Sequence, residues 1–265
     1  MKIKSIDFKG NKGQIHFEDT EIYFLNSLRR IMLSELPKLA IEDVIIYDNT
    51  SPLFDEIIAQ RLAMIPIPTD LKLITFRSEC TCEGKGCPNC TVRYTLSKEG
   101  EGTVYSGDLQ PEQPTWAIKE TKIPIVELSK DQRIILEVEA ILGRARDHAK
   151  WQTVIAPTYQ METNIEFDKK RMPEVKEFIS ELPKDIIAEI KGDKIVLKDP
   201  TKLALFESIL DASDVEYISI RKDPNRMMFS FETDGSLSAQ DALRESIRIL
   251  TGKYEELNKQ LKDVE

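Results

Sequence analysis

Apolar and polar residues alternate loosely at the start of the chain, between residues 2 and 17. Gly10 and Gly13 interrupt this alternation where a turn would fit, so the segment predicts two strands joined by a turn. The pattern then becomes helical over residues 21–36, and Pro37 marks the end of that helix. A hairpin followed by a helix is therefore expected at the N-terminal end.

The predicted helix at 21–36 is apolar on more than one side. Its apolar residues are spread too widely around the helix to form one stripe. A helix of this kind is buried from more than one side. It therefore lies deep in its own core or also contacts another chain. The residues that carry this expectation are Ile22, Tyr23, Phe24, Leu25, Leu28, Ile31, Met32, Leu33 and Leu36.

The C-terminal region predicts a long helix, capped by Ser238 with Asp241 three residues further on. Its apolar residues form two interleaved lines at a spacing of seven. These lines are Leu243, Leu250 and Leu257, and Ile247, Tyr254 and Leu261. Such spacing is typical of a helix packed along its length against another helix, in its own core or in a partner. The helix would span about 36 Å, more than a small domain usually covers, which favours a partner.

The middle of the chain, from about residue 41 to 151, is mostly strand-like. One helix is predicted at 54–65, ending at Pro66, and its apolar face comprises Phe54, Ile57, Ile58, Leu62 and Ile65. Strands are predicted at 41–47, 72–77, 91–96, 122–128 and 133–142. We expect a β-rich domain inserted between the two helical ends.

From about residue 169 to 214 the pattern changes again. It predicts a charged helix, a hairpin over 187–197 that turns at Gly192 and Asp193, and another helix. This segment is expected to be a second, smaller insert.

Composition narrows the possible functions. The 265 residues contain 37 Lys and Arg against 46 Asp and Glu, a net charge of −9 that disfavours bulk binding of nucleic-acid phosphates. Only two histidines are present, so His-rich metal sites and most His-based catalysis are disfavoured. No apolar run approaches the ~20 residues of a membrane span, and no signal-peptide pattern opens the chain. A soluble, cytoplasmic protein of one large or two to three small domains is expected.

All four cysteines fall in one window with the pattern C-x-C-x4-C-x2-C: Cys80, Cys82, Cys87 and Cys90. Two close cysteine pairs on either side of a Gly-rich turn can place four thiolates around one zinc ion. A site with four cysteine ligands is closed and structural, with no open position for catalysis. Disulfides, free thiols or a small iron–sulfur cluster are the alternatives.

One short basic segment, 143–151, contains Arg144, Arg146, His148 and Lys150, which would share one side of an extended chain. It predicts a docking surface for an acidic partner or nucleic acid, or simply a solvated loop. No Ser/His/Asp set, P-loop or dinucleotide-binding glycine pattern is found, so an enzyme active site is disfavoured.

Four segments together resemble one known family. They are FLNSLRRIML at 24–33, DEIIAQRLAMIP at 55–66, GRARDHAKW at 143–151 and FETDGSL at 231–237. The chain is similar to the assembly subunits of DNA-directed RNA polymerase, a family that includes the archaeal D-type subunits, the third-largest subunit of eukaryotic RNA polymerase II and the N-terminal domain of bacterial alpha. The cysteine cluster lies where eukaryotic relatives carry a zinc site, which favours zinc over the alternatives.

The resemblance implies an α+β fold with three parts. An alpha-subunit-like dimerisation domain, a sheet plus two long helices, would comprise residues 1–40 and 214–265, with 152–168 linking back to it. A β-rich inserted domain with the cysteine cluster would occupy 41–151. A small ferredoxin-like insert would occupy 169–213.

The resemblance also implies a non-catalytic role in transcription. The first and last helices would pair with a small partner, called subunit L in archaea, and the pair would carry the large catalytic subunits and two small zinc-containing subunits. The implied dimer interface comprises Phe24, Leu25, Leu28, Ile31, Met32, Leu243, Ile247, Leu250, Tyr254, Leu257 and Leu261. The implied large-subunit interface comprises Arg29, Arg30, Arg144, Arg146, His148 and Lys150. Neither sequence-specific DNA binding nor a membrane partner is expected.

In some archaeal relatives the small insert holds an iron–sulfur cluster, but here the corresponding positions lack cysteine. They are Leu182, Leu203, Phe206, Ile209 and Ser213. We expect an insert without a cluster, filled by apolar side chains, or else an unrelated α/β unit with accidental spacing. A ferredoxin-type redox protein and a zinc-module nucleic-acid binder are the alternative functions.

Overall fold

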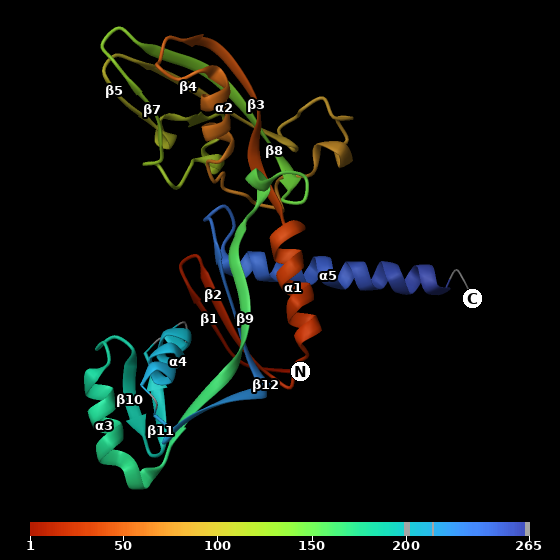
Figure 1. Cartoon of the computed structure of the whole chain (residues 1–265). Helices are drawn as coiled ribbons and strands as arrows, with labels where there is room; N and C mark the ends of the chain where they lie inside the picture. Colours follow the sequence, from red (N-terminus) through yellow and green to blue (C-terminus); the bar gives the residue numbers. More distant parts are fainter. Residues whose placement is uncertain (199–201, 214, 263–265) are drawn as a thin grey trace. The chain divides into compact units, whose positions relative to one another are not determined.

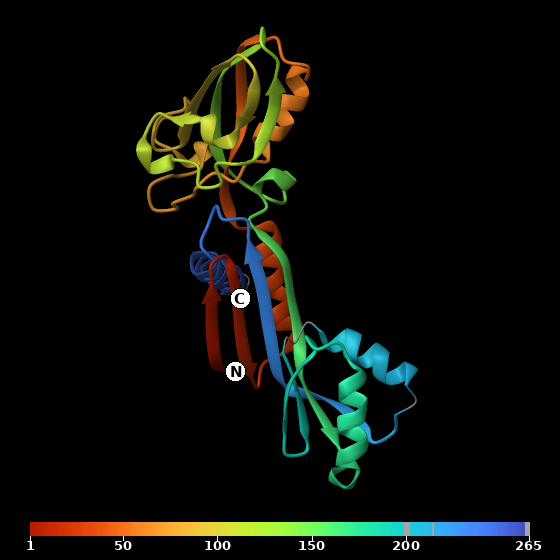
Figure 2. The same ribbon diagram turned by 90° about the vertical axis from the view of Figure 1, so that its left-hand side faces the viewer.

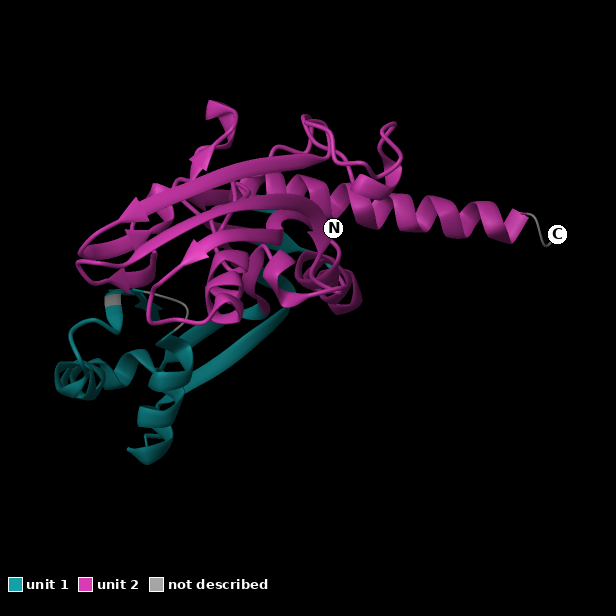
Figure 3. Cartoon of the chain, turned by 90° about the horizontal axis from the view of Figure 1, so that it is seen from above, with its two compact units in different colours: residues 1–4, 16–20, 160–228 teal, residues 5–15, 21–159, 229–265 magenta. Residues whose placement is uncertain are grey.

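The computed structural model describes residues 1–198, 202–213 and 215–262, which form two compact units (Figure 3). Unit 1 comprises Met1–Lys4, His16–Thr20 and Gln160–Met228, and unit 2 comprises Ser5–Ile15, Glu21–Tyr159 and Phe229–Glu265. The predicted domain boundary at residue 214, residues 199–201 of the predicted small insert and the terminal residues 263–265 lie outside the described residues.

Twelve strands and five α-helices are described along the chain (Figure 1). In order, they are β1 Lys2–Lys9, β2 Lys12–Glu18, α1 Ile22–Ser34, β3 Pro37–Asn49, α2 Asp55–Ala63, β4 Thr91–Glu99, β5 Gly102–Tyr105, β6 Gln110–Pro111, β7 Pro124–Leu128, β8 Arg133–Arg144, β9 Val154–Phe167, α3 Met172–Glu181, β10 Ile187–Lys191, β11 Lys194–Leu197, α4 Leu203–Ala212, β12 Ile218–Thr233 and α5 Ala239–Lys262. None of the described helices combines the length and the apolarity needed to cross a membrane.

In unit 2, parts of β1, β2, β12 and β9 lie side by side in that order. The predicted N-terminal hairpin is confirmed as β1 and β2. Gly13 is required where β2 meets β12, because a Cβ at this position would lie 2.5 Å from the ring of Phe231. The close approach of the two strands explains why glycine is needed at position 13 of the hairpin.

The two predicted terminal helices are confirmed as α1 and α5, which contact each other. Figure 1 shows them crossing, and Figure 2 shows α5 nearly end-on. Ser238 caps α5 as expected, because the backbone N–H of Asp241 donates to its Oγ at 3.1 Å. At the end of α1 the chain passes almost directly into β3, which begins at Pro37.

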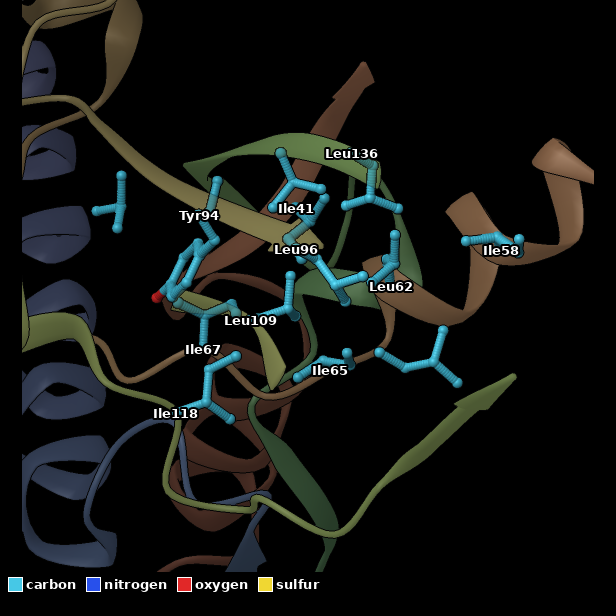
Figure 4. Packing of buried hydrophobic residues seen from close by; sticks show 14 of the residues in the cluster. Ile41, Ile58, Leu62, Ile65, Ile67, Tyr94, Leu96, Leu109, Ile118 and Leu136 are labelled. Carbon is cyan, nitrogen blue, oxygen red and sulfur yellow. The ribbon is translucent and has the colours of Figure 1, made fainter. Parts of the chain in front are cut away.

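The β-rich part of unit 2 has an antiparallel four-stranded sheet in the order β3-β8-β4-β6 and a separate pair, β5 and β7. Helix α2 packs against β3, and its residues Ile58 and Leu62 are fully buried. Figure 4 shows the side chains of this core, including Tyr94, whose hydroxyl donates to the carbonyl oxygen of Trp116 at 2.8 Å. The core draws its residues from 39 to 142.

Two sequence expectations about this part are wrong. Residues 72–77 form a turn and the start of a short 3-10 helix instead of a strand. Asp70 fixes that turn, since its side chain accepts from the N–H of Lys72 and its carbonyl from the N–H of Leu73. Phe54 and Ile57 were expected on the buried face of α2, but both are exposed, because Ile58 and Leu62 face the core.

Unit 1 contains the second part of β9, then α3, β10, β11, α4 and the first part of β12. Its strands lie in the order β12-β9-β11-β10. The predicted hairpin is confirmed as β10 and β11, with Lys191 opposite Lys194 and Gly192 in the left-handed region at φ 63°. The core of this unit draws residues from 165 to 218. Strands β9 and β12 were not predicted from sequence.

Candidate functional site

The first half of α5 packs on its own chain. Leu243 and Leu250, from the first heptad line, are buried, as are Ala239, Ala242 and Ser246. Helix α1 contacts α5 here and contributes buried residues of its own. The inward side of α5 is therefore occupied within this chain.

The apolar residues further along α5 are not covered by that core: they are Ile247, Tyr254 and Leu261 of the second heptad line and Leu257 of the first. Ile247, Tyr254, Leu257 and Leu261 keep 46%, 51%, 50% and 57% of their surface exposed, and we call these four residues the outer α5 face. Every described residue from 251 to 262 is exposed, and Figure 1 shows this half of α5 running past α1. Exposed apolar residues at helical spacing on a 24-residue helix form an unpartnered helix face.

Helix α1 divides its apolar residues differently from the sequence expectation. Leu25, Leu28, Ile31 and Met32 are buried within this chain, and Phe24 is half-buried. The exposed apolar residues are Ile22 and Tyr23 in the first turn, which the sequence interpretation did not include in the interface. Which apolar residues of α1 are buried and which are exposed depends on how the helix packs against its neighbours.

The two arginines of α1 differ in their surroundings. Arg29 is half-buried, and its Nε and Nη2 donate to Oδ1 of Asn26 at 3.2 and 2.8 Å. Arg30 is exposed. Of the two, Arg30 presents the freer charge.

The basic segment 143–151 is not extended. It forms a turn and a short 3-10 helix at Ala149–Trp151, which separates the four basic residues. Gly143 permits this folding, since a Cβ there would lie 2.2 Å from the indole of Trp151. The expectation that all four basic side chains share one open side is wrong.

Lys150 is turned inward, where it forms an ion pair with Glu42 and donates to the carbonyl oxygen of Ile41 at 3.1 Å. Its Nζ also lies 4.5 Å from the Trp151 ring centroid. Burial and these three contacts make Lys150 a structural residue of this chain.

The other three basic residues are more open. Arg144 lies over the ring of Phe76 at 4.3 Å, and Arg146 lies 3.5 Å from Glu35 at the end of α1. His148 is exposed and accepts the backbone N–H of Lys150 through Nδ1 at 3.1 Å. These three remain available for a docking role.

A buried ion pair joins β3 to the end of β12. Lys38 Nζ lies 2.5 Å from Oδ2 of Asp234, and the two side chains are only 4% and 14% exposed. Lys38 also donates to the carbonyl oxygen of Gln152 at 3.3 Å. The other carboxylate oxygen of Asp234 accepts from the Ser236 N–H and hydroxyl at 3.0 and 2.6 Å. The Lys38–Asp234 pair thus joins three segments that are distant in sequence.

The four cysteines converge on one point. Sulfur atoms of Cys80 and Cys87, and of Cys82 and Cys90, lie 3.5 Å apart, and those of Cys87 and Cys90 lie 3.9 Å apart. All four lie within 4.8 Å of one another. Tetrahedral zinc with bonds of ~2.3 Å separates its sulfur ligands by about 3.8 Å. The donor set and its spacing therefore fit zinc, whereas a disulfide needs about 2.05 Å between two sulfurs.

The surroundings of Cys80 and Cys82 favour the thiolate form that binds metal, whereas Cys87 differs: a hydrogen bond from the Asn89 N–H lowers its pKa, but its hydrogen bonds with the other three thiols and its burial raise the pKa to about 11. A hydrogen bond from the Cys82 N–H lowers the pKa of Cys80. Burial alone would raise the pKa of Cys82, but hydrogen bonds from the neighbouring thiols and from the N–H groups of Cys87 and Gly86 lower it to about 6. Glycines at 84 and 86, both at φ 81°, give the turn its left-handed residues.

The positions that the sequence resemblance matched with iron–sulfur ligands lie in and beside the core of unit 1. Phe206 is fully buried and meets Phe178 edge-on, with ring centroids 6.3 Å apart. Leu182 is buried, while Leu203 and Ile209 pack against the same core. Ser213 follows α4 and donates to the carbonyl oxygen of Ile209 at 2.6 Å.

Comparison with known proteins places these features in a family. A family model described as the RNA polymerase Rpb3/Rpb11 dimerisation domain matches residues 14–254. The chain is 34% identical over 271 residues to DNA-directed RNA polymerase subunit Rpo3 of Picrophilus torridus, covering 97% of this chain and 98% of that protein. It is 38% identical over 242 residues to Rpo3 of Thermoplasma volcanium (86% and 88% covered) and 33% identical over 264 residues to Rpo3 of Archaeoglobus fulgidus (100% and 99% covered). This chain therefore belongs to the RNA polymerase Rpb3/Rpb11 dimerisation domain family.

Proposed function

We propose that the chain is a non-catalytic assembly subunit of archaeal DNA-directed RNA polymerase and works in the cytoplasm. It pairs with a smaller subunit of the L or Rpb11 type, and the pair then receives the large catalytic subunits and small zinc-containing subunits. The nucleotidyl-transfer site lies on the large subunits. The outer α5 face carries the proposal, and the names of the relatives support it. Neither a redox protein nor a nucleic-acid-binding zinc module finds support among those relatives.

The outer α5 face suits a partner helix for an energetic reason. Each of its four side chains has about half of its surface exposed. Burying the rest would contribute roughly 1 kcal/mol per side chain. Because the first half of α5 is already packed in this chain, the helix should lose little conformational entropy when a partner binds. Ile22 and Tyr23 of α1 are also exposed, and they would add apolar area if a partner covered both helices.

The chain would divide into three parts, and its two separate cores support this division. The core drawn from 39 to 142 supports a β-rich insert at 41–151, and the core drawn from 165 to 218 supports an insert at 169–213. The order of elements in unit 1, β-α-β-β-α-β, is that of ferredoxin-like domains. The remaining segments, 1–40, 152–168 and 214–265, would form the dimerisation domain.

The large catalytic subunits would contact the exposed charges of α1 and the basic segment. Arg30, Arg144, Arg146 and His148 are open enough to do so, and Arg29 contributes through its half-buried guanidinium. Lys150 acts indirectly, since its ion pair with Glu42 holds the fold of the basic segment.

The four cysteines would hold one structural zinc ion. Such an ion cross-links its ligands and gives a short loop a fixed conformation without a large apolar core. The residues from Cys80 to Cys90 contribute one buried apolar side chain, that of Cys90, to the surrounding core. The metal would therefore be the main source of order in this loop.

Co-expression tests the assembly role directly. The full chain expressed alone is expected to aggregate or to form mixed oligomers, because the outer α5 face is uncovered. Co-expressed with the L-type subunit of the same source, it is expected to give a stable 1:1 heterodimer by mass measurement in solution. A well-behaved monomer that ignores that subunit would contradict the proposal.

Iron analysis tests the small insert. Because apolar side chains fill the positions of the cluster ligands, the purified chain is expected to contain no stoichiometric iron in unit 1 and to show no visible absorption band. The control is a relative that retains the four-cysteine run in this insert, purified under the same anaerobic conditions. A stoichiometric iron–sulfur cluster bound at unit 1 would refute the interpretation.

A further inference from the structure

The cysteine centre has a charged neighbour. Four thiolates around one Zn²⁺ carry a net charge of −2, which must be compensated by solvent or by the protein. The charged residues within the surrounding loop, Glu79, Glu83 and Lys85, are all exposed. Arg77, just before the loop, is only 26% exposed in its side chain.

The guanidinium of Arg77 approaches the cysteine loop at two places, Thr91 and Gly86. Its Nη2 donates to Oγ1 of Thr91 at 3.1 Å, and that oxygen lies 3.7 Å from the sulfur of Cys90. The same Nη2 would lie 3.0 Å from a Cβ at Gly86, whose backbone N–H donates to Cys82. The guanidinium thus packs against both halves of the loop that presents the sulfurs.

Acidic residues of the neighbouring sheet hold the guanidinium in place. Nη2 donates to Oε2 of Glu139 at 2.7 Å, and Nη1 lies 3.5 Å from Oδ2 of Asp43. The hydrogen bond to Glu139 raises the pKa of Arg77 above its usual value, and the charge of Cys90 acts in the same direction. The Nε–H of Arg77 is buried, and this donor of the guanidinium has no hydrogen-bond partner among the described residues.

We propose that Arg77 is a positioning residue of the zinc centre, which offsets the charge of the four thiolates and thereby slows the loss of the metal. This inference rests on the proposed zinc site and adds to it a residue that binds no metal itself. Outer partners of this kind typically change metal affinity by about 10- to 100-fold.

The chain offers a matched control in Arg93. Its Nε donates to the other carboxylate oxygen of Glu139 at 3.0 Å, so it belongs to the same ion-pair cluster. Its side chain is directed to Glu139 and, unlike that of Arg77, is not bonded to Thr91 beside the Cys90 sulfur. Loss of Arg93 disturbs Glu139 without removing the charge beside the sulfurs.

The test follows zinc release from the full-length chain to a chelating dye. Arg77→Met and Arg77→Gln are each expected to release zinc about 10- to 100-fold faster than the unmodified chain. Arg77→Lys, which keeps the charge, is expected to restore most of the retention, and Arg93→Met to match the unmodified chain. The Co²⁺-substituted proteins should keep the same thiolate absorption bands, since the ligand set is unchanged.

Equal zinc release from the neutral Arg77 variants and the unmodified chain would overturn the proposal, and so would equally fast release from Arg93→Met. If Arg77→Met fails to fold, Arg77→Gln decides, because its amide can still donate to Glu139. Metal analysis of the unmodified chain is done first. If that chain binds no zinc, the proposed zinc site is wrong, and this outcome differs from a failure of the Arg77 proposal alone.

Discussion

Replacing Leu257 with aspartate is expected to abolish stable pairing with the L-type partner while leaving the chain's own fold intact. Leu257 lies in the middle of the outer α5 face and is half-exposed in this chain, so its loss removes little packing from the core. In the heterodimer, the new carboxylate would be buried without a partner in an apolar seam. The combined effect is about 4 kcal/mol, or roughly a thousand-fold in the dissociation constant.

The measurement is the dissociation constant of the purified heterodimer, with Lys259→Asp as the control. Lys259 is exposed and lies two residues after Leu257, about 160° around the helix, so this change adds a carboxylate on the side opposite to the outer α5 face. The control should bind as the unmodified chain does. Full pairing of Leu257→Asp would exclude the outer α5 face as the interface. Leu250→Asp is a poorer test, because Leu250 is buried in its own chain.

The distinction between Leu257 and Leu250 marks a limit of the heptad pattern. The spacing of seven correctly predicted a helix with apolar residues along its length. Both residues belong to one heptad line, but α1 covers α5 only over its first half. Where that cover ends depends on where two helices distant in sequence cross. No local pattern contains that information.

Short motifs were predicted better than long strands. The cysteine spacing alone indicated a metal centre, because ligands within eleven residues are brought together by local turns. Strands β9 and β12 were missed, since their burial does not alternate regularly and their order comes from pairing with distant strands. Residues 72–77 were instead predicted to be a strand that the structure does not have. Their apolar residues resemble a strand, but the turn at Asp70 and the bond from Thr75 N–H to the carbonyl of Asn89 hold them in a loop.

The ion pair of Lys38 and Asp234 could not be predicted from sequence at all. The two residues are 196 positions apart, and a lysine at the start of an apolar strand is expected to be exposed. The segment 231–237 did contribute to the family resemblance, but resemblance does not say what its aspartate contacts. The structure gives that residue a physical role.

Asp234→Ala is expected to destabilise the protein by about 3–5 kcal/mol, because it leaves the Lys38 ammonium buried with only one carbonyl partner. It also frees the N–H and hydroxyl of Ser236, which adds to the loss. At fixed concentration of the heterodimer, the melting temperature should fall by about 10 °C.

Two further variants show whether the buried charge is the cause. Glu232→Ala removes an exposed partner of Lys12, 3.6 Å away near the end of the same strand, and should change stability by less than about 1 kcal/mol. Lys38→Met combined with Asp234→Leu removes both charges and should recover much of the lost stability, since an apolar pair of similar size needs no compensation. If the double variant is as unstable as Asp234→Ala, the loss of the local hydrogen bonds from Ser236 to Asp234 accounts for the destabilisation, and the buried charge of Lys38 does not.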